Sequence, residues 1–593
     1  MIRDFNTTCL ATACGLAAFA GMTASVLADP TIQDIAPADA AFVVSIPNLS
    51  ALHESFSDGS LGDMMKEPAV EKFVRVLTET IVAEIEQSMA ESDLGFGADD
   101  LALPTGAVGF SLTFHPEYYS TPLFLMMADF GENQDTISEV IEAAIDKRVD
   151  SGVEMSEDDY HGVTIMHLTE HPPEPTAEEL QWWDQMGQEY VPPDPTEEFY
   201  AWNGSTLLFA TDEQQMLNAL DAFDNKDVDS VGSTDKFADA MAHHPDNPPL
   251  WMYVNLAPIF EEFMPAPDDE MFMPSPISML GGLGLQSVST LSVSMQLDDG
   301  TSMMTNTFYL ASDDPQGIFD LAGKSEQAFE PPAFVGADAV SVMTIAYDLP
   351  GLADIVEKIA TDFATSFSQD QQQANMMVQQ IMGIVRPAFE SMGGQIISTS
   401  YAKQDADLGV VAANLFALPS DDVTVIQNLL NLGAGQGMMS GRDFEGGMIF
   451  DLAPQAALMA ADIAFGVGHG YFFIGEQEQV ENALRRLANP GAATLADEPE
   501  FQRATASLSP RAMGYSYLNG SAQLNMLTQL AETSLNNMNN PMWGEPDEST
   551  QRWMDVLEAV PQKELLEKYF SASVSEMQRT RDGFIMKSYM LSN

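Results

Sequence analysis

Regularly spaced apolar residues predict both strands and helices along this chain. From Phe42 to Ile46 and from Val108 to Phe114, every second residue is large and apolar, which is the pattern of a strand with two unlike faces. From Leu49 to Phe56 and from Ile137 to Ala144, apolar residues recur at spacings of three and four, which is typical of an amphipathic helix. The pattern therefore predicts strands and helices that alternate along the chain.

Several strands are expected to pair as antiparallel hairpins. Val108–Phe114 is followed by a turn at 115–117 and a returning strand at Leu123–Ala128. Ile396–Ala402 and Leu408–Leu415 flank a second turn that begins at Gln404. Two Asp-Gly dipeptides, Asp299-Gly300 and Asp582-Gly583, predict further hairpins because Asp-Gly favours a two-residue turn.

Much of the pattern occurs twice. Asp159–Leu168 matches Asp443–Leu452, and Leu207–Ala257 matches Tyr471–Ser521 without a gap. A duplicated chain consists of related halves that each bury a core. We therefore expect an α+β fold with two duplicated halves, each with an antiparallel or mixed sheet and packed helices.

The repeat also predicts the domain boundaries. We expect a first half at 29–311, a linker at 312–332 that is interrupted by prolines, and a second half at 333–593. A strand, turn and helix unit opens each half and recurs near its end. The recurrences at Trp251–Leu256 and Tyr515–Asn519 resemble Val43–Leu49, so four copies are expected.

The first residues predict export. Arg3 precedes an apolar stretch of small residues from Leu10 to Leu27, and we expect a signal peptide at 1–28 with cleavage after Ala28. Both cysteines, Cys9 and Cys14, would be removed with it. A lipoprotein acylated on Cys14 is the alternative. No later run of about 20 apolar residues is present, so no stable membrane insertion is expected after cleavage, and the mature chain would be secreted or periplasmic.

Charge narrows the range of partners. Lys and Arg number 23 and Asp and Glu 89, giving a formal net charge of −66, although 45% of residues are hydrophobic. The apolar content argues against disorder, and the negative field excludes nucleic acid as a partner. Adaptation to salt explains the acidity, with calcium binding as the alternative. The best calcium candidate, a run of acidic residues from Asp221 to Asp229, lacks the ligand order and glycine of an EF-hand loop.

The two halves differ most in two insertions that carry tryptophan. His171–Asn203 holds Trp182 and Trp183, and Asn536–Trp553 holds Trp543. Because loops often carry function, Trp182, Trp183 and Trp543 are the candidate binding residues, for an unknown protein or glycan partner. The alternative is that these tryptophans pin long loops onto their own half.

Catalytic and metal motifs are absent from the sequence. No zinc-protease His-Glu-x-x-His, phosphate-binding loop or Gly-x-Ser-x-Gly elbow occurs. His161 and His167 are expected on one face of a strand, where Glu445 and Asp451 replace them in the second half, and we assign them to a solvated face. His243-His244 is expected in a loop, and the methionines of 263–276 reflect general abundance rather than copper binding. No catalytic residue, metal site or cofactor is therefore predicted.

Two stretches resemble a group of uncharacterised secreted bacterial proteins. One is Ala36–Val44, with its Pro-Ala-Asp-Ala strand motif, followed by Asn48-Leu49. The other runs from Phe472 to Phe501 and includes Leu495-Ala496-Asp497-Glu498-Pro499. The group is a domain of unknown function. The resemblance implies export and α+β repeats, but it implies no activity and no site residues.

Together these observations predict an exported, acidic, non-enzymatic binding or structural protein of the periplasm or cell exterior. Two alternatives remain open. One is an extracellular hydrolase whose carboxylate pair cannot be chosen among so many acids. The other is a calcium-dependent surface protein.

Overall fold

The structure is a computed structural model. It describes residues 30–593 except 58, 92–102, 115–121, 174, 187–189, 191, 264–282, 298–301, 313, 325–328, 368–370, 406–408, 454–462, 511 and 539–547. Several predicted features lie outside the described residues. They are the signal peptide at 1–28, the turns at 115–117 and Asp299-Gly300, Trp543, and all but Phe263 of the methionine-rich stretch.

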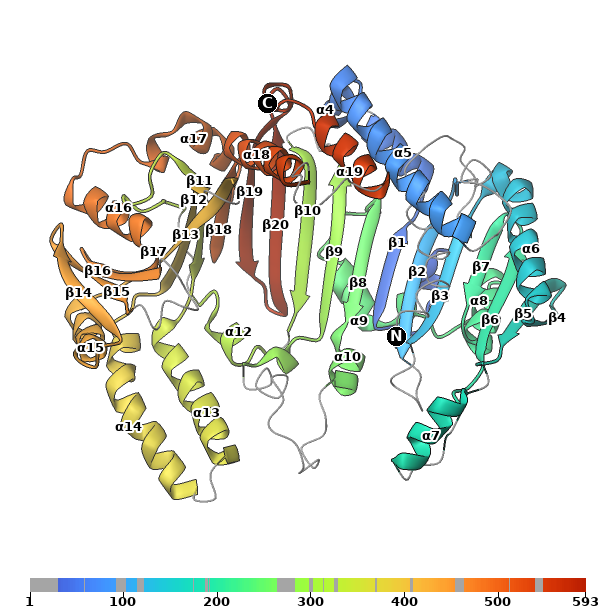
Figure 1. The fold of residues 1–593 in the computed structure, drawn as a ribbon, viewed down its shortest axis with the longest axis horizontal. Helices are drawn as coiled ribbons and strands as arrows, with labels where there is room; N and C mark the ends of the chain where they lie inside the picture. Colours follow the sequence, from blue (N-terminus) through green and yellow to red (C-terminus); the bar gives the residue numbers. More distant parts are fainter. Residues whose placement is uncertain are drawn as a thin grey trace. The chain divides into compact units, whose positions relative to one another are not determined.

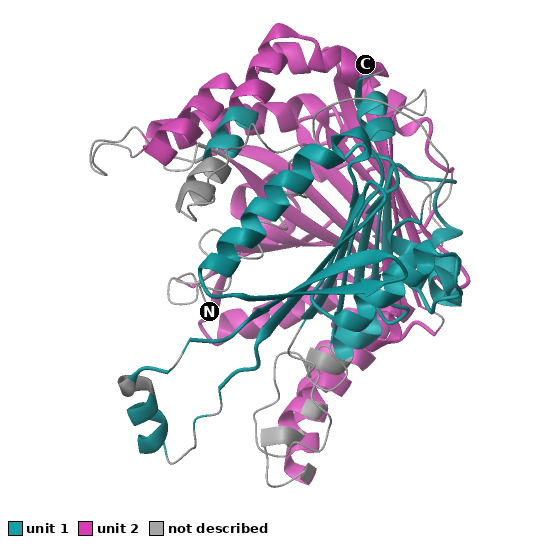
Figure 2. Cartoon of the chain, turned by 90° about the vertical axis from the view of Figure 1, so that its right-hand side faces the viewer, with its two compact units in different colours: residues 1–58, 77–262, 292–295 teal, residues 59–76, 263–291, 296–593 magenta. Residues whose placement is uncertain are grey.

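The chain divides into two compact units, shown in teal and magenta in Figure 2. Unit 1 comprises residues 1–58, 77–262 and 292–295, and unit 2 comprises 59–76, 263–291 and 296–593. Three elements, α5 (Pro68–Glu91), α10 (Leu256–Phe263) and β9 (Thr290–Leu297), contribute residues to both units.

Unit 1 is built on an antiparallel sheet in the order β8-β1-β2-β3-β7-β6-β5-β4. The predicted hairpin is formed by β2 and β3, in which Val108 pairs with Ala128. The strands are β1 (Phe42–Ile46), β2 (Val108–Phe114), β3 (Pro122–Asp129), β4 (Glu154–Tyr160), β5 (Val163–Glu170), β6 (Thr196–Asn203), β7 (Thr206–Ala210) and β8 (Leu250–Asn255).

The helices of unit 1 pack on this sheet through small apolar clusters. Ile145 of α6 meets Leu168 of β5 in one such cluster, and α8 contacts β6, β7 and α2. The helices are α2 (Ile32–Ile35), α3 (Leu49–Ser57), α6 (Gln134–Asp150), α7 (Ala177–Gln185), α8 (Glu213–Phe223), α9 (Asp235–Met241) and α10 (Leu256–Phe263).

Unit 2 carries a longer antiparallel sheet in the order β10-β20-β19-β18-β11-β12-β13-β17-β16-β15-β14. From β18 to β14 this order corresponds, strand for strand, to the order from β8 to β4 in unit 1. The strands are β10 (Ser302–Ala311), β11 (Ala339–Ala346), β12 (Gln395–Asp405), β13 (Gly409–Pro419), β14 (Met439–Phe444), β15 (Gly447–Leu452), β16 (Ile463–Gly468), β17 (Tyr471–Glu476), β18 (Gly514–Asn519), β19 (Phe570–Arg579) and β20 (Gly583–Ser592).

Helices cover both faces of the unit 2 sheet. Neighbouring strand residues point to opposite faces, so Phe473 joins a core with Val480 of α16, whereas Phe472 joins another with Ile426 of α15. The helices of unit 2 are α4 (Gly59–Met65), α12 (Ile318–Leu321), α13 (Leu349–Phe367), α14 (Gln371–Glu390), α15 (Val423–Gly435), α16 (Gln477–Ala488), α17 (Pro499–Thr505), α18 (Gly520–Met538), α19 (Glu548–Ala559) and α20 (Lys563–Leu566).

A strand that runs directly into a capped helix occurs four times. β1, β8, β11 and β18 lead into α3, α10, α13 and α18. An Asn or Asp side chain at each junction accepts a backbone N–H, which satisfies an unpaired donor at the helix start. These bonds are Ala51 N to Asn48, Ala257 N to Asn255, Gly351 N to Asp348 and Ala522 N to Asn519. Within each unit the two such strands pair with each other, β1 with β8 and β11 with β18.

The α+β class is confirmed, because the described residues combine helices with antiparallel sheets. The hairpin at Asp582-Gly583 is also present as β19 and β20, with Arg579 paired to Phe584. Thr580 N donates to Gly583 O at 2.8 Å, so the turn consists of Arg581 and Asp582, one residue before the predicted Asp582-Gly583. In the part of the chain that the structure describes, we find no helix with the length and apolarity needed to cross a membrane.

Candidate functional site

Trp182 and Trp183 of the first insertion lie on α7, which connects the paired strands β5 and β6 (Figure 1). The ring centroids of Trp182 and Trp183 are 5.0 Å apart at an interplanar angle of 83°. Trp183 also contacts Tyr190, with 6.3 Å between ring centroids. The structure therefore brings together three aromatic residues of the insertion.

The two tryptophans differ in environment. Trp183 is half-buried against Tyr190, a residue of the same insertion, so this contact ties the insertion to itself rather than to the sheet. Trp182 is 54% exposed, and Leu180 and Met186 beside it are also exposed. Both views show α7 clear of the other described helices and strands of unit 1 (Figures 1 and 2). The exposed large apolar residues here are Leu180 and Trp182 of α7 and Met186, which directly follows it; we call these three residues the contact surface of α7.

His161 does not lie on a strand with His167, so that prediction was wrong. His161 and Gly162 form the turn between β4 and β5, with φ of 55° and 86°, and Tyr160 pairs with Val163 across it. Two consecutive positive φ angles are characteristic of a type I′ turn, which favours glycine at its second position. His167 remains on β5, where its ring stacks on Phe199 at 4.4 Å.

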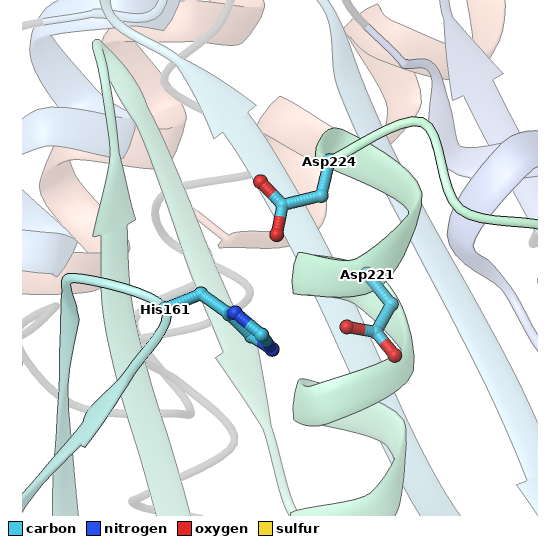
Figure 3. A group of neighbouring side chains, drawn as sticks. All are labelled: His161, Asp221 and Asp224. Carbon is cyan, nitrogen blue, oxygen red and sulfur yellow. The ribbon is translucent and has the colours of Figure 1, made fainter.

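The turn brings His161 to the C-terminal end of α8, where it meets two acids (Figure 3). One ligand atom from each of His161, Asp221 and Asp224 lies within 4.8 Å of the others. Asp221 and Asp224 belong to the acidic run that the sequence offers for calcium. Among the described residues, this is the group of His, Cys, Asp and Glu whose spacing would suit a metal ion.

A lysine of the chain itself occupies this group. Lys226 Nζ lies 2.5 Å from Asp221 Oδ1, 3.1 Å from His161 Nε2 and 3.7 Å from the Asp224 carboxylate. The hydrogen bond from Lys226 lowers the pKa of Asp221, and the same bond raises the pKa of Lys226. The Tyr160 hydroxyl also donates to Asp221, at 2.8 Å. A metal ion would have to displace the ammonium, because Lys226 already offsets one of the two carboxylate charges in this corner, where the β4–β5 turn meets α8.

The corresponding corner of unit 2 repeats the geometry with different charges. Glu445 and Gly446 form the turn between β14 and β15, again with positive φ of 47° and 78°. Phe444 takes the place of Tyr160, and Arg485 that of Asp221 in the gapless match. The Arg485 guanidinium lies 5.5 Å from the Phe444 ring centroid, as Lys226 lies 5.4 Å from that of Tyr160. Both corners place a cation over an aromatic ring. The pair of acids, Asp221 and Asp224, occurs only in the unit 1 corner among the described residues. The shared contact therefore fastens a hairpin turn to a helix.

The remaining histidine candidates are structural. His244 is buried, and its ring nitrogens lie 2.7 Å from the hydroxyls of Ser292 and Ser294 on β9. The predicted loop placement holds for the backbone after α9, but the side chain points into the core of unit 1. A buried imidazole with both nitrogens hydrogen-bonded is a satisfied core residue.

Unit 2 also has an open polar cleft of about 680 Å³ that the sequence pattern does not predict. It lies along α18, which contributes Asn525, Gln529 and Asn536, and it is bordered by Gln562 and Gln404. The opposite face of α18 exposes Leu527 and Leu530. The polar residues of α18 recur at spacings of three and four, and this pattern could have indicated a polar helix face. An amphipathic helix usually buries its apolar face, whereas α18 turns its polar face toward the cleft and exposes Leu527 and Leu530.

Comparisons of this chain with protein-family models, with curated proteins and with solved structures found no match.

Proposed function

We propose that the protein is an exported, acidic, non-enzymatic binding protein of the periplasm or cell exterior, built from two duplicated halves. The export pattern at 1–28 supports the location. The corresponding strand orders of the two units support the duplication. Its partner is a protein that binds the contact surface of α7.

Equivalent packing at matched positions further supports the duplication. Phe237 of α9 meets Tyr253 of β8 edge to face, with ring centroids 5.3 Å apart at 75°. Their counterparts in the gapless match, Phe501 and Tyr517, are 5.0 Å apart at 73°. Two units that shared only a class of fold would not be expected to keep the same ring geometry at positions that the sequence match aligns.

The observation that carries the binding proposal is the exposure of large apolar side chains on α7. Leu180 and Trp182 lie on α7 and Met186 directly follows it, within an insertion in the sheet, so the sheet does not need these side chains for its own core. Tryptophan is enriched among the residues that dominate binding energy at protein interfaces. Trp182 and Met186 are four residues apart and joined by a backbone hydrogen bond, so they share one side of the helical path, and an apolar side of this kind fits a groove on a partner.

The charge of the chain selects the kind of partner. Glu178, Glu179 and Asp184 accompany the tryptophans, and the formal net charge of the protein is −66. A partner with basic residues around its groove would be steered to α7 by this field. We therefore propose a basic protein.

A hydrolase is supported less well by the described carboxylates. Burial raises the pKa of Glu500, as a general acid would require. However, Glu500 is not among the residues that line the described cleft. Among the described residues, the group whose spacing would suit a metal ion is already bound by Lys226. These observations favour binding over catalysis.

The test is site-specific photo-cross-linking in the producing cells. A photoreactive phenylalanine at Met186 is expected to give one adduct of defined mass, and the same probe at Leu530 of α18 is the matched exposed control. In the purified pair, Leu180→Ser with Trp182→Ser is expected to weaken binding at least tenfold, because a central tryptophan contributes about 2 kcal/mol or more.

The same screen can overturn the proposal. Equal adducts at Met186 and Leu530, or unchanged affinity in the double variant, would remove α7 as the contact. A glycan array is probed in parallel. Glycan binding that is lost in Asn525→Ala with Gln529→Ala, but kept in the α7 variant, would place the contact in the polar cleft instead.

A further inference from the structure

Helices α13 and α14 form a hairpin whose two helices lie side by side in unit 2 (Figure 1). Ala353 of α13 packs against Val378 and Met382 of α14. Arg386 of α14 reaches back to α13, 2.7 Å from Asp354 and 2.5 Å from Glu357. The hairpin is therefore held together by an apolar seam and a set of ion pairs.

The apolar face of α14 is wider than α13 covers. Met377, Ile381 and Ile384 follow a spacing of four and three on the flank beside the buried Val378 and Met382, so the apolar arc continues past the seam. Ile381 is 51% exposed and Ile384 49% exposed. Met376 and Met377 of α14 and Phe363 of α13 are exposed as well. Exposed apolar residues gathered in this way mark an interaction site rather than scattered surface residues.

This face also lacks charge. From Gln371 to Val385 the chain has no Asp, Glu, Lys or Arg, although its formal net charge is −66. Of the charged residues of α13, Asp354 and Glu357 lie beside α14 and pair with Arg386, whereas Lys358 falls on the side away from the seam by helical spacing. Burial of the hairpin face would therefore desolvate no charged group on α14.

We propose that the exposed face of the α13–α14 hairpin binds a second copy of this chain. A basic partner would be recognised through acidic residues, and residues 371–385 contain no acidic residue. A two-fold contact places the same patch against itself, which an uncharged apolar face tolerates and an acidic surface does not. Two hairpins joined in this way form a four-helix bundle, which covers the second face of each α14.

The size of the face sets the expected strength. At about 100 Å² for each of these half-exposed side chains, the face removes on the order of 500 Å² per copy from water. A standard interface buries about 800 Å² per partner, so a weak, concentration-dependent dimer is expected. Because each copy is strongly negative, salt should tighten the dimer by screening the repulsion between copies.

The test is sedimentation velocity of the chain from Asp29 onward, over a concentration series at low salt and at about 1 M NaCl, where charges are screened beyond roughly 3 Å. The dimer is expected to increase with concentration and with salt. Ile381→Glu with Ile384→Glu is expected to weaken it at least ~100-fold, because like charges would be buried opposite one another. The matched control is Leu527→Glu with Leu530→Glu, which alters two exposed leucines of α18.

Thermal unfolding of both variants separates loss of folding from loss of association. A dimer that persists in the α14 variant, or is lost equally in the α18 control, would overturn the proposal. So would a chain that stays monomeric at every concentration and salt. Vesicles of neutral phosphatidylcholine are tested alongside. Capture of the monomer by vesicles through Ile381 and Ile384 would assign the face to lipid and reject the second copy.

Discussion

At the scale of single residues, burial rather than a partner sets the chemistry of Glu500. This glutamate lies in the first turn of α17, partly covered by unit 2. Burial raises its pKa above the ordinary value of 4.5, Arg503 opposes the shift, and Glu567 and Glu498 add to it. In the gapless match its counterpart in unit 1 is Lys236, so the position does not demand an acid.

The raised pKa of Glu500 predicts a pH dependence of stability. The folded state binds this proton more tightly than the unfolded state. The resulting stabilisation is therefore fully present below the unfolded pKa and is lost as pH rises through the folded pKa. Glu500→Gln should raise the thermal midpoint at pH 7 and leave it unchanged near about pH 4. Glu532→Gln, an exposed change on α18, is the control, and equal effects of both variants at pH 7 would contradict the prediction.

The residue scale is also where the sequence was least informative. The alternation on both sides of His161 predicts one continuous strand, whereas His161 and Gly162 form a turn. The signal for that turn is local, because an X-Gly pair between two alternating segments favours a two-residue turn. Lys226 was overlooked because its role depends on a contact with a turn far away in the sequence. The acids of the calcium candidate were visible in the sequence, but the cation among them was not.

At the scale of elements, glycines set how closely α16 approaches its sheet. A Cβ on Gly466 of β16 would lie 2.5 Å from Val480 of α16, a buried residue. Gly447 and Gly468 similarly leave room for Leu484. The helix therefore packs against backbone, and Val480 joins the same buried core as Phe473.

This close approach predicts opposite effects of two glycine substitutions. Gly466→Ala should lower the free energy of unfolding by about 1–3 kcal/mol, because the added methyl group overpacks the core. Gly383→Ala on α14 has no neighbour within 4 Å, and it should stabilise by about 0.5–1 kcal/mol because glycine is unfavourable inside a helix. Urea unfolding midpoints measure both. A midpoint that Gly466→Ala leaves unchanged would mean that α16 can shift outward.

At the scale of the whole molecule, the net charge of −66 opposes the compact state, and salt relieves that repulsion. In the described residues, the group best suited to a metal ion already holds Lys226. The thermal midpoint should therefore rise with ionic strength and be the same in CaCl₂ and NaCl at matched ionic strength. A rise specific to calcium would show that part of the acidity builds ion sites, and the calcium-dependent alternative would then gain support.

The sequence by itself determined the α+β class and most of the element types. Alternation and helical spacing are local properties, and they persist whatever packs above them. The junctions at Asn48 and Asn519 could be predicted for the same reason, because a cap is made within a few residues of its helix.

The tertiary structure alone decided which surfaces are covered. The large residues Phe42 and Phe110 alternate with Ser45 and Gly109, yet the small residues are the buried ones. Ile32 of α2 lies directly over Gly109, and no local pattern encodes that contact. The exposure of Trp182 and Ile381 was decided in the same way. The periodicity of apolar residues shows that an element has two unlike faces. Which face is buried is determined by the distant segment that packs against it.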